Sequence, residues 1–180
     1  MTKTNLRITT LVLVGFLFSL TSKGQNSTYV PGAVVLNWGD TLQGELNQYI
    51  RFTSNLKFRF SGYYKPLGVD FDQISQFRLL QTWYARKEVK GKGEIFIEDV
   101  KTNLVPFYRL TLSRGKHKRD IFYQYYFAVP SEEKLVRLTN GTFHDYLLPL
   151  LSNYPNLLES VERVGNDPNQ ICNILRHAEP

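Results

Sequence analysis

One change in hydrophobic periodicity, near residue 140, constrains the fold of this chain more than any other feature. Before it, apolar residues fall in short runs bounded by Gly, Pro, Asn and Asp, and Leu56–Phe60 alternates apolar and basic side chains. Such period-two runs are typical of half-buried strands. After it, Phe143, Tyr146, Leu147 and Leu150 recur at intervals of three and four, which indicates a helix face. Strands followed by helices predict an α+β fold: a mainly antiparallel β-sheet or partly open barrel of about seven to nine strands, with short C-terminal helices from about residue 141.

The run Ile121–Val129 predicts a strand in the interior of that sheet. Tyr123, Tyr125 and Phe127 lie in one alternating row, and most of the other row is also apolar. A strand that is apolar on both faces is normally covered on both. The run Phe107–Leu112 is predicted to be its hairpin partner.

Prolines predict where the C-terminal helices begin and end. Pro149 is expected to kink or end the first helix, and Pro155 to open a second. Asp167 and Pro168 fit the N-cap and first residue of a third helix.

The first 24 residues have the pattern of a secretory signal peptide. Lys3 and Arg7 precede the apolar run Ile8–Leu20, and small residues at Ser22 and Gly24 predict cleavage before Gln25. The alternative is a retained membrane anchor, but the apolar run of about 13 residues is shorter than the ~20 that a spanning helix needs. We therefore expect an exported protein of the periplasm or cell envelope, or a secreted one, in which residues 25–180 form a single β-rich domain.

Charge and cysteine content place few demands on partners. Residues 1–24 hold three basic residues and no acidic one, so their removal lowers the formal net charge from +6 to +3. A charge of this size requires no anionic partner. Cys172 is the single cysteine, so no internal disulfide is expected. It either pairs with another chain or is buried as a small apolar residue, and its place between isoleucines favours burial.

The pattern of reactive side chains predicts a protein that is not an enzyme and needs no cofactor. His117, His144 and His177 are scattered, which disfavours a metal site. The chain has no Gly-x-Ser-x-Gly elbow and no phosphate-binding glycine loop. Asp70 and Asp72 could act as an acid/base pair of a hydrolase, but such a pair more often caps a turn.

A basic cluster is expected at the tip of the hairpin between residues 107 and 129. Arg114, Lys116, Lys118 and Arg119 lie within six positions and are candidate contacts for an anionic surface component, including peripheral contact with a membrane. The signal peptide argues against nucleic acid. The alternative is a solvated hairpin end whose charges discourage edge pairing.

The run Val35–Leu46 predicts the first hairpin of the domain. Gly39 suits a turn, and Asn37 or Asp40 can bond the local backbone. Trp38 is a candidate partner contact if it is exposed.

Two stretches together resemble an uncharacterised family of exported proteins from Gram-negative bacteria. The first is Tyr29–Leu46, with its Asn-x-Gly-Asp-Thr turn, and the second is Phe143–Leu158, which is similar to the helical end of those proteins. The resemblance implies no catalytic residues. It also implies that Thr41, in the tripeptide Asp-Thr-Leu, fits an O-glycosylation pattern of such bacteria.

These observations favour a non-enzymatic exported envelope module that binds a protein partner or an anionic surface component. The alternative is a small-ligand carrier with an aromatic-lined β-barrel cavity, for which Tyr123, Tyr125 and Phe127 are the candidate lining. A hydrolase that uses Asp70 and Asp72 ranks last.

Overall fold

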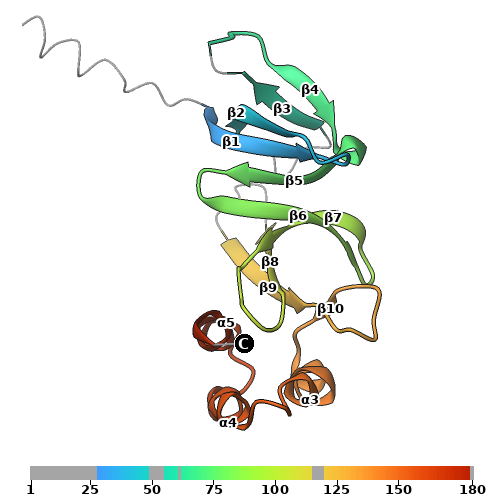
Figure 1. Ribbon diagram of the computed structural model, residues 1–180, viewed down its shortest axis with the longest axis vertical. Coiled ribbons are helices and arrows are strands. Elements are labelled where there is room, and N and C mark those ends of the chain that lie inside the picture. The colour runs from blue at the N-terminus through green and yellow to red at the C-terminus, as the bar shows by residue number, and fades with distance from the viewer. Residues whose placement is uncertain (1–27, 49–54, 61, 115–119, 179–180) are drawn as a thin grey trace, which may run out of the picture.

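A computed structural model describes residues 28–48, 55–60, 62–114 and 120–178 of the chain. These residues form one ten-stranded sheet with helices at its C-terminal end (Figure 1). The strands are β1 (Tyr29–Leu36), β2 (Thr41–Asn47), β3 (Asn55–Arg59), β4 (Leu67–Asp70), β5 (Ile74–Leu79), β6 (Thr82–Val89), β7 (Gly93–Asp99), β8 (Phe107–Arg114), β9 (Asp120–Phe127) and β10 (Val136–Arg137).

The strand order is β10-β9-β8-β7-β6-β5-β1-β2-β3-β4, and every neighbouring pair is antiparallel. The chain therefore runs outward from β1 to the edge strand β4. It then returns through a short 3-10 helix, η2 (Phe71–Gln73), so that β5 pairs with the free side of β1. From β5 onward each strand lies beside the next one in sequence.

The first five strands are rolled rather than flat. Through the β1–β2–β3–β4 register, Asp70 lies level with the start of β1. In a flat sheet it would be about 25 Å or more from Asn37, which follows the end of β1. Only two residues after Asp70, however, the Asp72 carbonyl accepts a hydrogen bond from the Asn37 side chain. The sheet must curl for both facts to hold, and the buried residues Val34, Leu46, Phe58 and Phe77 fill the concave side.

The second half of the sheet also curls. The backbone N–H of Leu135, just before β10, donates to the Glu88 carbonyl at 2.9 Å, and the N–H of Lys90 donates to the Leu135 carbonyl at 3.4 Å. The end of β6 is thereby joined to the segment before the last strand. Ala85, Ile97 and Tyr126 pack within this curl.

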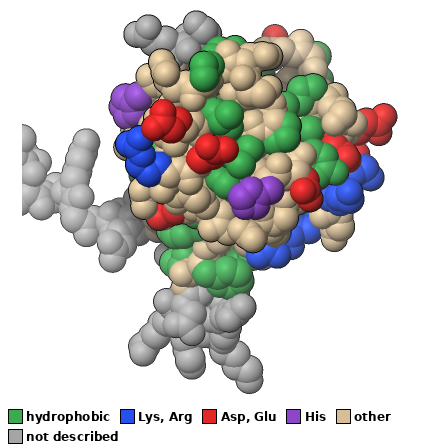
Figure 2. Space-filling model, turned by 90° about the horizontal axis from the view of Figure 1, so that it is seen from below, with side chains coloured by type: hydrophobic (Ala, Val, Ile, Leu, Met, Phe, Trp, Pro, Cys, Tyr) green, Lys and Arg blue, Asp and Glu red, His purple; other side chains and the backbone are tan. Residues whose placement is uncertain are grey.

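The helices cover one face of β8 and β9. They are α2 (Asn140–Thr142), the π-helical η3 (Phe143–Leu147), α3 (Leu148–Leu150), α4 (Pro155–Val164) and α5 (Pro168–His177). Their buried side chains, among them Phe143, Leu147 and Ile171, pack against Phe107 and Phe127. Figure 2 looks onto this helical end, where partly exposed hydrophobic side chains lie among charged ones. None of the described helices has the length and apolar character needed to cross a bilayer.

The α+β class, the antiparallel sheet and the C-terminal helices agree with the prediction, but the strand number of seven to nine was wrong. A strand without a strong sequence pattern is β4, whose sequence Leu-Gly-Val-Asp follows Pro66 and contains a glycine. It is short and lies at the edge of the sheet, where a strand needs only one partner and little apolar alternation. Around β9 the prediction holds: Phe127 packs against the helices and Tyr126 packs on the opposite face.

Candidate functional site

The pairing between β7 and β8 covers only part of β7. β7 pairs with β6 from Gly93 to Glu98. Its ladder with β8, in the described ranges, consists of Glu98 opposite Arg109 and Asp99 opposite Tyr108. β8 in turn pairs with β9 from Phe107 to Arg114. The first five residues of β7 therefore part from the last residues of β8, and the two strands leave a V-shaped opening, the β7–β8 cleft.

Main-chain polar groups of both strands point into this cleft. In an antiparallel ladder, the residues that exchange hydrogen bonds with one neighbour alternate along the strand. The N–H of Val100 donates to the Phe107 carbonyl at 3.0 Å, which sets the phase. Counting in steps of two, the peptide groups of Glu94 and Phe96 in β7 face β8, and those of Thr111 and Ser113 in β8 face β7. These four residues lie beyond the point where the ladder ends.

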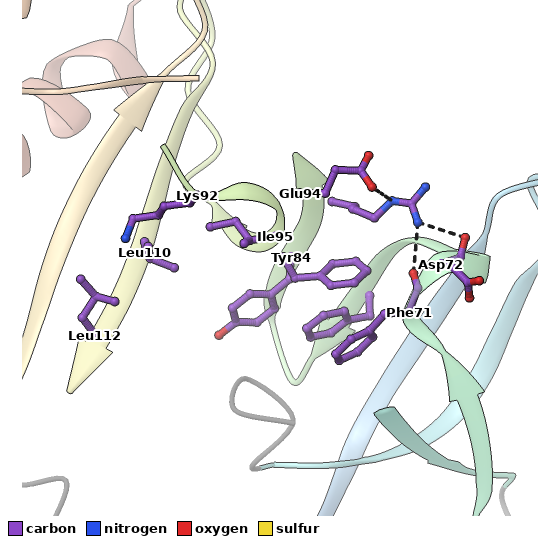
Figure 3. A pocket seen from close by; sticks show the side chains of 11 residues that line it. Phe71, Asp72, Tyr84, Lys92, Glu94, Ile95, Leu110 and Leu112 are labelled. Carbon is purple, nitrogen blue, oxygen red and sulfur yellow. Dashed lines mark hydrogen bonds and ion pairs between the residues drawn. The ribbon is translucent and has the colours of Figure 1, made fainter. Parts of the chain in front are cut away.

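A pocket of about 640 Å³ occupies the same place. Figure 3 shows Leu110 and Leu112 of β8 on one side, Phe71, Asp72 and Tyr84 on the other, and Ile95 between them. The complete lining is Phe71, Asp72, Phe77, Tyr84, Arg86, Lys92, Glu94, Ile95, Phe96, Leu110 and Leu112. Its walls are mainly apolar, with charged side chains from β6, η2 and the β6–β7 turn.

Four aromatic rings form one wall. Phe77 stacks on Tyr84 with a centroid distance of 4.8 Å, and Phe96 lies 5.1 Å from both Phe77 and Phe71. These rings come from η2, β5, β6 and β7, which the rolled sheet brings together. Since Phe77 and Tyr84 are buried, the wall is continuous with the core and is held in place by it.

Arg86 is the best-anchored charged group of the pocket. One of its terminal nitrogens donates to the carbonyl oxygens of Phe71 at 3.2 Å and Asp72 at 3.0 Å. Its Nε lies 3.9 Å from a carboxylate oxygen of Glu94 (Figure 3). The guanidinium group is thus fixed between η2 and β7, and it gives the apolar pocket one positioned cation.

The structure places the predicted contact Trp38 at the surface. Trp38 is 64% exposed in the β1–β2 turn, and its indole N–H donates to a carboxylate oxygen of Asp40 at 2.8 Å. Gly39 has a φ of 98°, as the predicted turn requires. Thr41 is exposed at the first position of β2, so its hydroxyl is accessible.

Tyr123, Tyr125 and Phe127 do not line the pocket. Phe127 is fully buried, and Tyr125 is 8% exposed beneath the helices, where its hydroxyl donates to the Asn169 side chain at 2.7 Å. Burial raises the pKa of Tyr125. Tyr123 is half exposed, and the Arg109 guanidinium lies 4.8 Å from its ring centre. Phe127 and Tyr125 therefore pack beneath the helices, and Tyr123 lies at the surface beside them.

The basic tip falls largely outside the described part of the chain. Lys116, Lys118 and Arg119 lie in the range 115–119, and Arg114 is described only as the backbone end of β8. Their contact with an anionic component stays a prediction.

The remaining candidates are dispersed. Asp70 ends β4, and Asp72 lies in η2 at the edge of the pocket. Within the described ranges, no three His, Cys, Asp or Glu side chains gather as metal ligands would. Cys172 is 4% exposed in α5, and burial raises the pKa of its thiol to about 11.

Sequence reasoning missed the pocket-lining residues Phe77, Tyr84, Arg86 and Phe96. Three of them are aromatic residues in strands, where an aromatic side chain usually belongs to the core, and Arg86 has no distinguishing sequence context. Their shared wall depends on the roll of the sheet, and the sequence carries no local signal for it.

Comparison with protein-family models finds no match, and neither a curated protein nor a solved structure matches the chain. The resemblance to exported Gram-negative proteins accordingly stays a prediction.

Proposed function

We propose that this chain is a non-enzymatic, exported envelope module that binds an extended segment of a partner protein in the β7–β8 cleft. The observation that carries the proposal is the end of the β7–β8 ladder after Glu98 and Arg109. Beyond that point two strand edges face each other across an apolar pocket.

An extended segment satisfies both features of the cleft at once. Its main chain can pair with the peptide groups of Phe96 or Thr111, which supplies affinity by strand addition. Its alternating side chains would enter the pocket beside Ile95, Leu110 and the aromatic wall, which supplies selectivity. A volume of about 640 Å³ lies within the ~300–1,000 Å³ of typical binding pockets.

Export is supported by the sequence of residues 1–24, in which a basic start, a short apolar run and small residues follow one another.

A second candidate is a carrier for a small apolar ligand in the same pocket. The observation that favours it is the wall of four rings beside Arg86, whose guanidinium could pair with an acidic group of the ligand.

Two substitutions separate these functions. Thr111→Pro removes one main-chain donor that faces the cleft, without altering a side chain that lines the pocket, and it leaves the partners of β9 in place. Phe96→Ala removes part of the aromatic wall. Nine-residue peptides selected from a random display library serve as probes for strand addition, and the fluorescent dye 1-anilinonaphthalene-8-sulfonate serves as the probe for a small apolar ligand.

Strand addition predicts that Thr111→Pro weakens the selected peptides about 2- to 12-fold, the value of one hydrogen bond, and leaves dye binding unchanged. It also predicts slower amide exchange at Phe96 and Thr111 when peptide is bound. A small-ligand carrier predicts loss of dye binding in Phe96→Ala and no effect of Thr111→Pro on either probe. The proposal would be contradicted if no peptide can be selected. It would also be contradicted if the bound peptide slows amide exchange at other residues instead of Phe96 and Thr111.

A further inference from the structure

The turn between β3 and β4 exposes a group of aromatic and aliphatic side chains. Tyr64 is 96% exposed, Tyr63 71%, Leu67 54% and Phe60 38%. We call these four residues the aromatic tip. Exposed apolar side chains are ordinary when they are scattered, but a contiguous group commonly marks a contact surface.

The aromatic tip is anchored to the core by a chain of ring contacts. Phe58 is fully buried and meets Phe60 edge to face at 4.9 Å, and Phe60 meets Tyr63 at 6.4 Å. Pro66 fixes the backbone ahead of Leu67, because its ring restricts φ. Phe60 and Tyr63 are therefore held by packing, which lowers the cost of ordering this part of the turn on binding.

The unpaired charges of the hairpin from Asn55 to Val69 are basic. No acidic residue occurs from Leu46 to Val69. Lys65 follows Tyr64 in the turn, and Lys57 lies in β3 opposite Gly68; both are exposed. Arg59, by contrast, forms an ion pair with Glu45, so it is already neutralised. The two free lysines and the adjacent tyrosines give the hairpin a cationic, amphipathic surface.

The hairpin also lies where a flat surface can reach it. Figure 1 shows β3 and β4 at one end of the long axis of the molecule and the helices at the opposite end. Tyrosine rings favour the headgroup level of a bilayer, and lysines near a bilayer are attracted by anionic lipids. Protein interfaces, in contrast, are depleted in lysine.

We infer that the aromatic tip, together with Lys57 and Lys65, docks this protein on the headgroups of an anionic lipid surface. Tyr63 and Tyr64 enter the headgroup layer, and the lysines pair with lipid phosphates above them. The site is separate from the β7–β8 cleft and does not depend on the function proposed there.

The test is sedimentation of the chain from Gln25 onward, which contains every described element, with vesicles of phosphatidylcholine alone or with about one third phosphatidylglycerol. We expect binding to the anionic vesicles only. Tyr63→Ser/Tyr64→Ser should reduce it about tenfold or more, and Lys57→Ser/Lys65→Ser about threefold or more. The controls are Tyr154→Ser on the helical end and Lys90→Ser in the β6–β7 turn, which should remain within twofold of the parent chain.

A second measurement does not rely on loss of binding. In Tyr64→Trp, the new indole should be quenched by brominated phosphatidylglycerol more strongly than the tryptophans of the parent chain. The inference is overturned if the parent chain does not bind anionic vesicles, if neutral vesicles bind equally well, or if the control variants lose as much binding as the tip variants. It is also overturned if the tip variants bind vesicles normally and lose only a protein partner.

Discussion

Replacement of Gly44 by Ala tests whether the roll of the first five strands is as tight as described. A Cβ at Gly44 would lie 2.6 Å from a ring carbon of Phe58 and still closer to the carbonyl oxygen of Arg59. Neither neighbour can withdraw easily. Phe58 is fully buried and is held by Phe60, and Arg59 is paired with Glu45 in the β2–β3 ladder.

The size of the effect follows from two opposing contributions. Overpacking of a tight site costs about 1–3 kcal/mol, and both neighbours here are constrained, which favours the upper part of that range. Replacing Gly by Ala also stabilises by about 0.4–1 kcal/mol, through a lower entropy of the unfolded chain. We therefore expect Gly44→Ala to lower the free energy of unfolding by about 2 kcal/mol, or the melting temperature by about 4–8 °C.

Gly68 in β4 is the matched control, because a Cβ there would meet nothing within 4 Å and its φ is not in the left-handed region. Gly68→Ala should leave stability unchanged or raise it by about 0.5 kcal/mol. Urea unfolding followed by tryptophan fluorescence and by circular dichroism gives both values. Equal midpoints for the two variants would refute the rolled packing of β2 against β3.

Three further predictions concern the helical end. The Asp167 carboxylate caps α5, and its hydrogen bonds with Gln170 and Asn169 lower its pKa. Its contribution to the stability of the fold is therefore present above the pKa of the unfolded chain and is lost as pH falls through the lower pKa of the folded chain. Asp167→Asn should remove this acid dependence when unfolding is measured as a function of pH, and an unchanged profile would count against the cap. Because burial raises the pKa of Cys172 to about 11, its thiol at pH 8 should react with an aromatic disulfide reagent about 100-fold or more slowly than in urea, and equal rates would show that it is accessible. Tyr125→Phe should cost about 1 kcal/mol in urea unfolding by removing the bond to Asn169, whereas Tyr146→Phe, whose bond to Glu132 is 3.4 Å long, should cost less; the reverse order would contradict the assignment.

Local patterns were sufficient for most elements of the fold. Alternation in Leu56–Phe60 predicts β3, the runs Phe107–Leu112 and Ile121–Val129 predict β8 and β9, and Val35–Leu46 predicts the β1–β2 hairpin. Asp167 and Pro168 begin α5 as expected. Pro149 does not break the helical segment at once: η3 runs directly into α3, and Leu147 and Leu148 ahead of the proline have helical backbone angles. The segment ends instead at Leu151.

The site could not be predicted in the same way, because it depends on contacts between distant residues. The position of β5 beside β1 joins Gly32 to Leu79, and no local pattern specifies that pairing. The divergence of β7 from β8 occurs within two runs that each read as regular strands. The aromatic tip was overlooked for a different reason: its tyrosines lie in a stretch with Gly62 and Pro66, which indicates a turn and not the exposure of its side chains.

The central position of β1 has a consequence for the order in which the chain can acquire structure. Of the strands in the described ranges, β1 is synthesised first, yet its second neighbour, β5, begins only at Ile74. Until Leu79 has left the ribosome, β1 can pair only with β2, so it forms an open edge of the sheet that β1 to β4 can already build. Long-range pairing of this kind is slow. That edge stays open to pairing with other chains until β5 covers it, so the order of synthesis leaves β1 exposed while β2 to β4 are already in place.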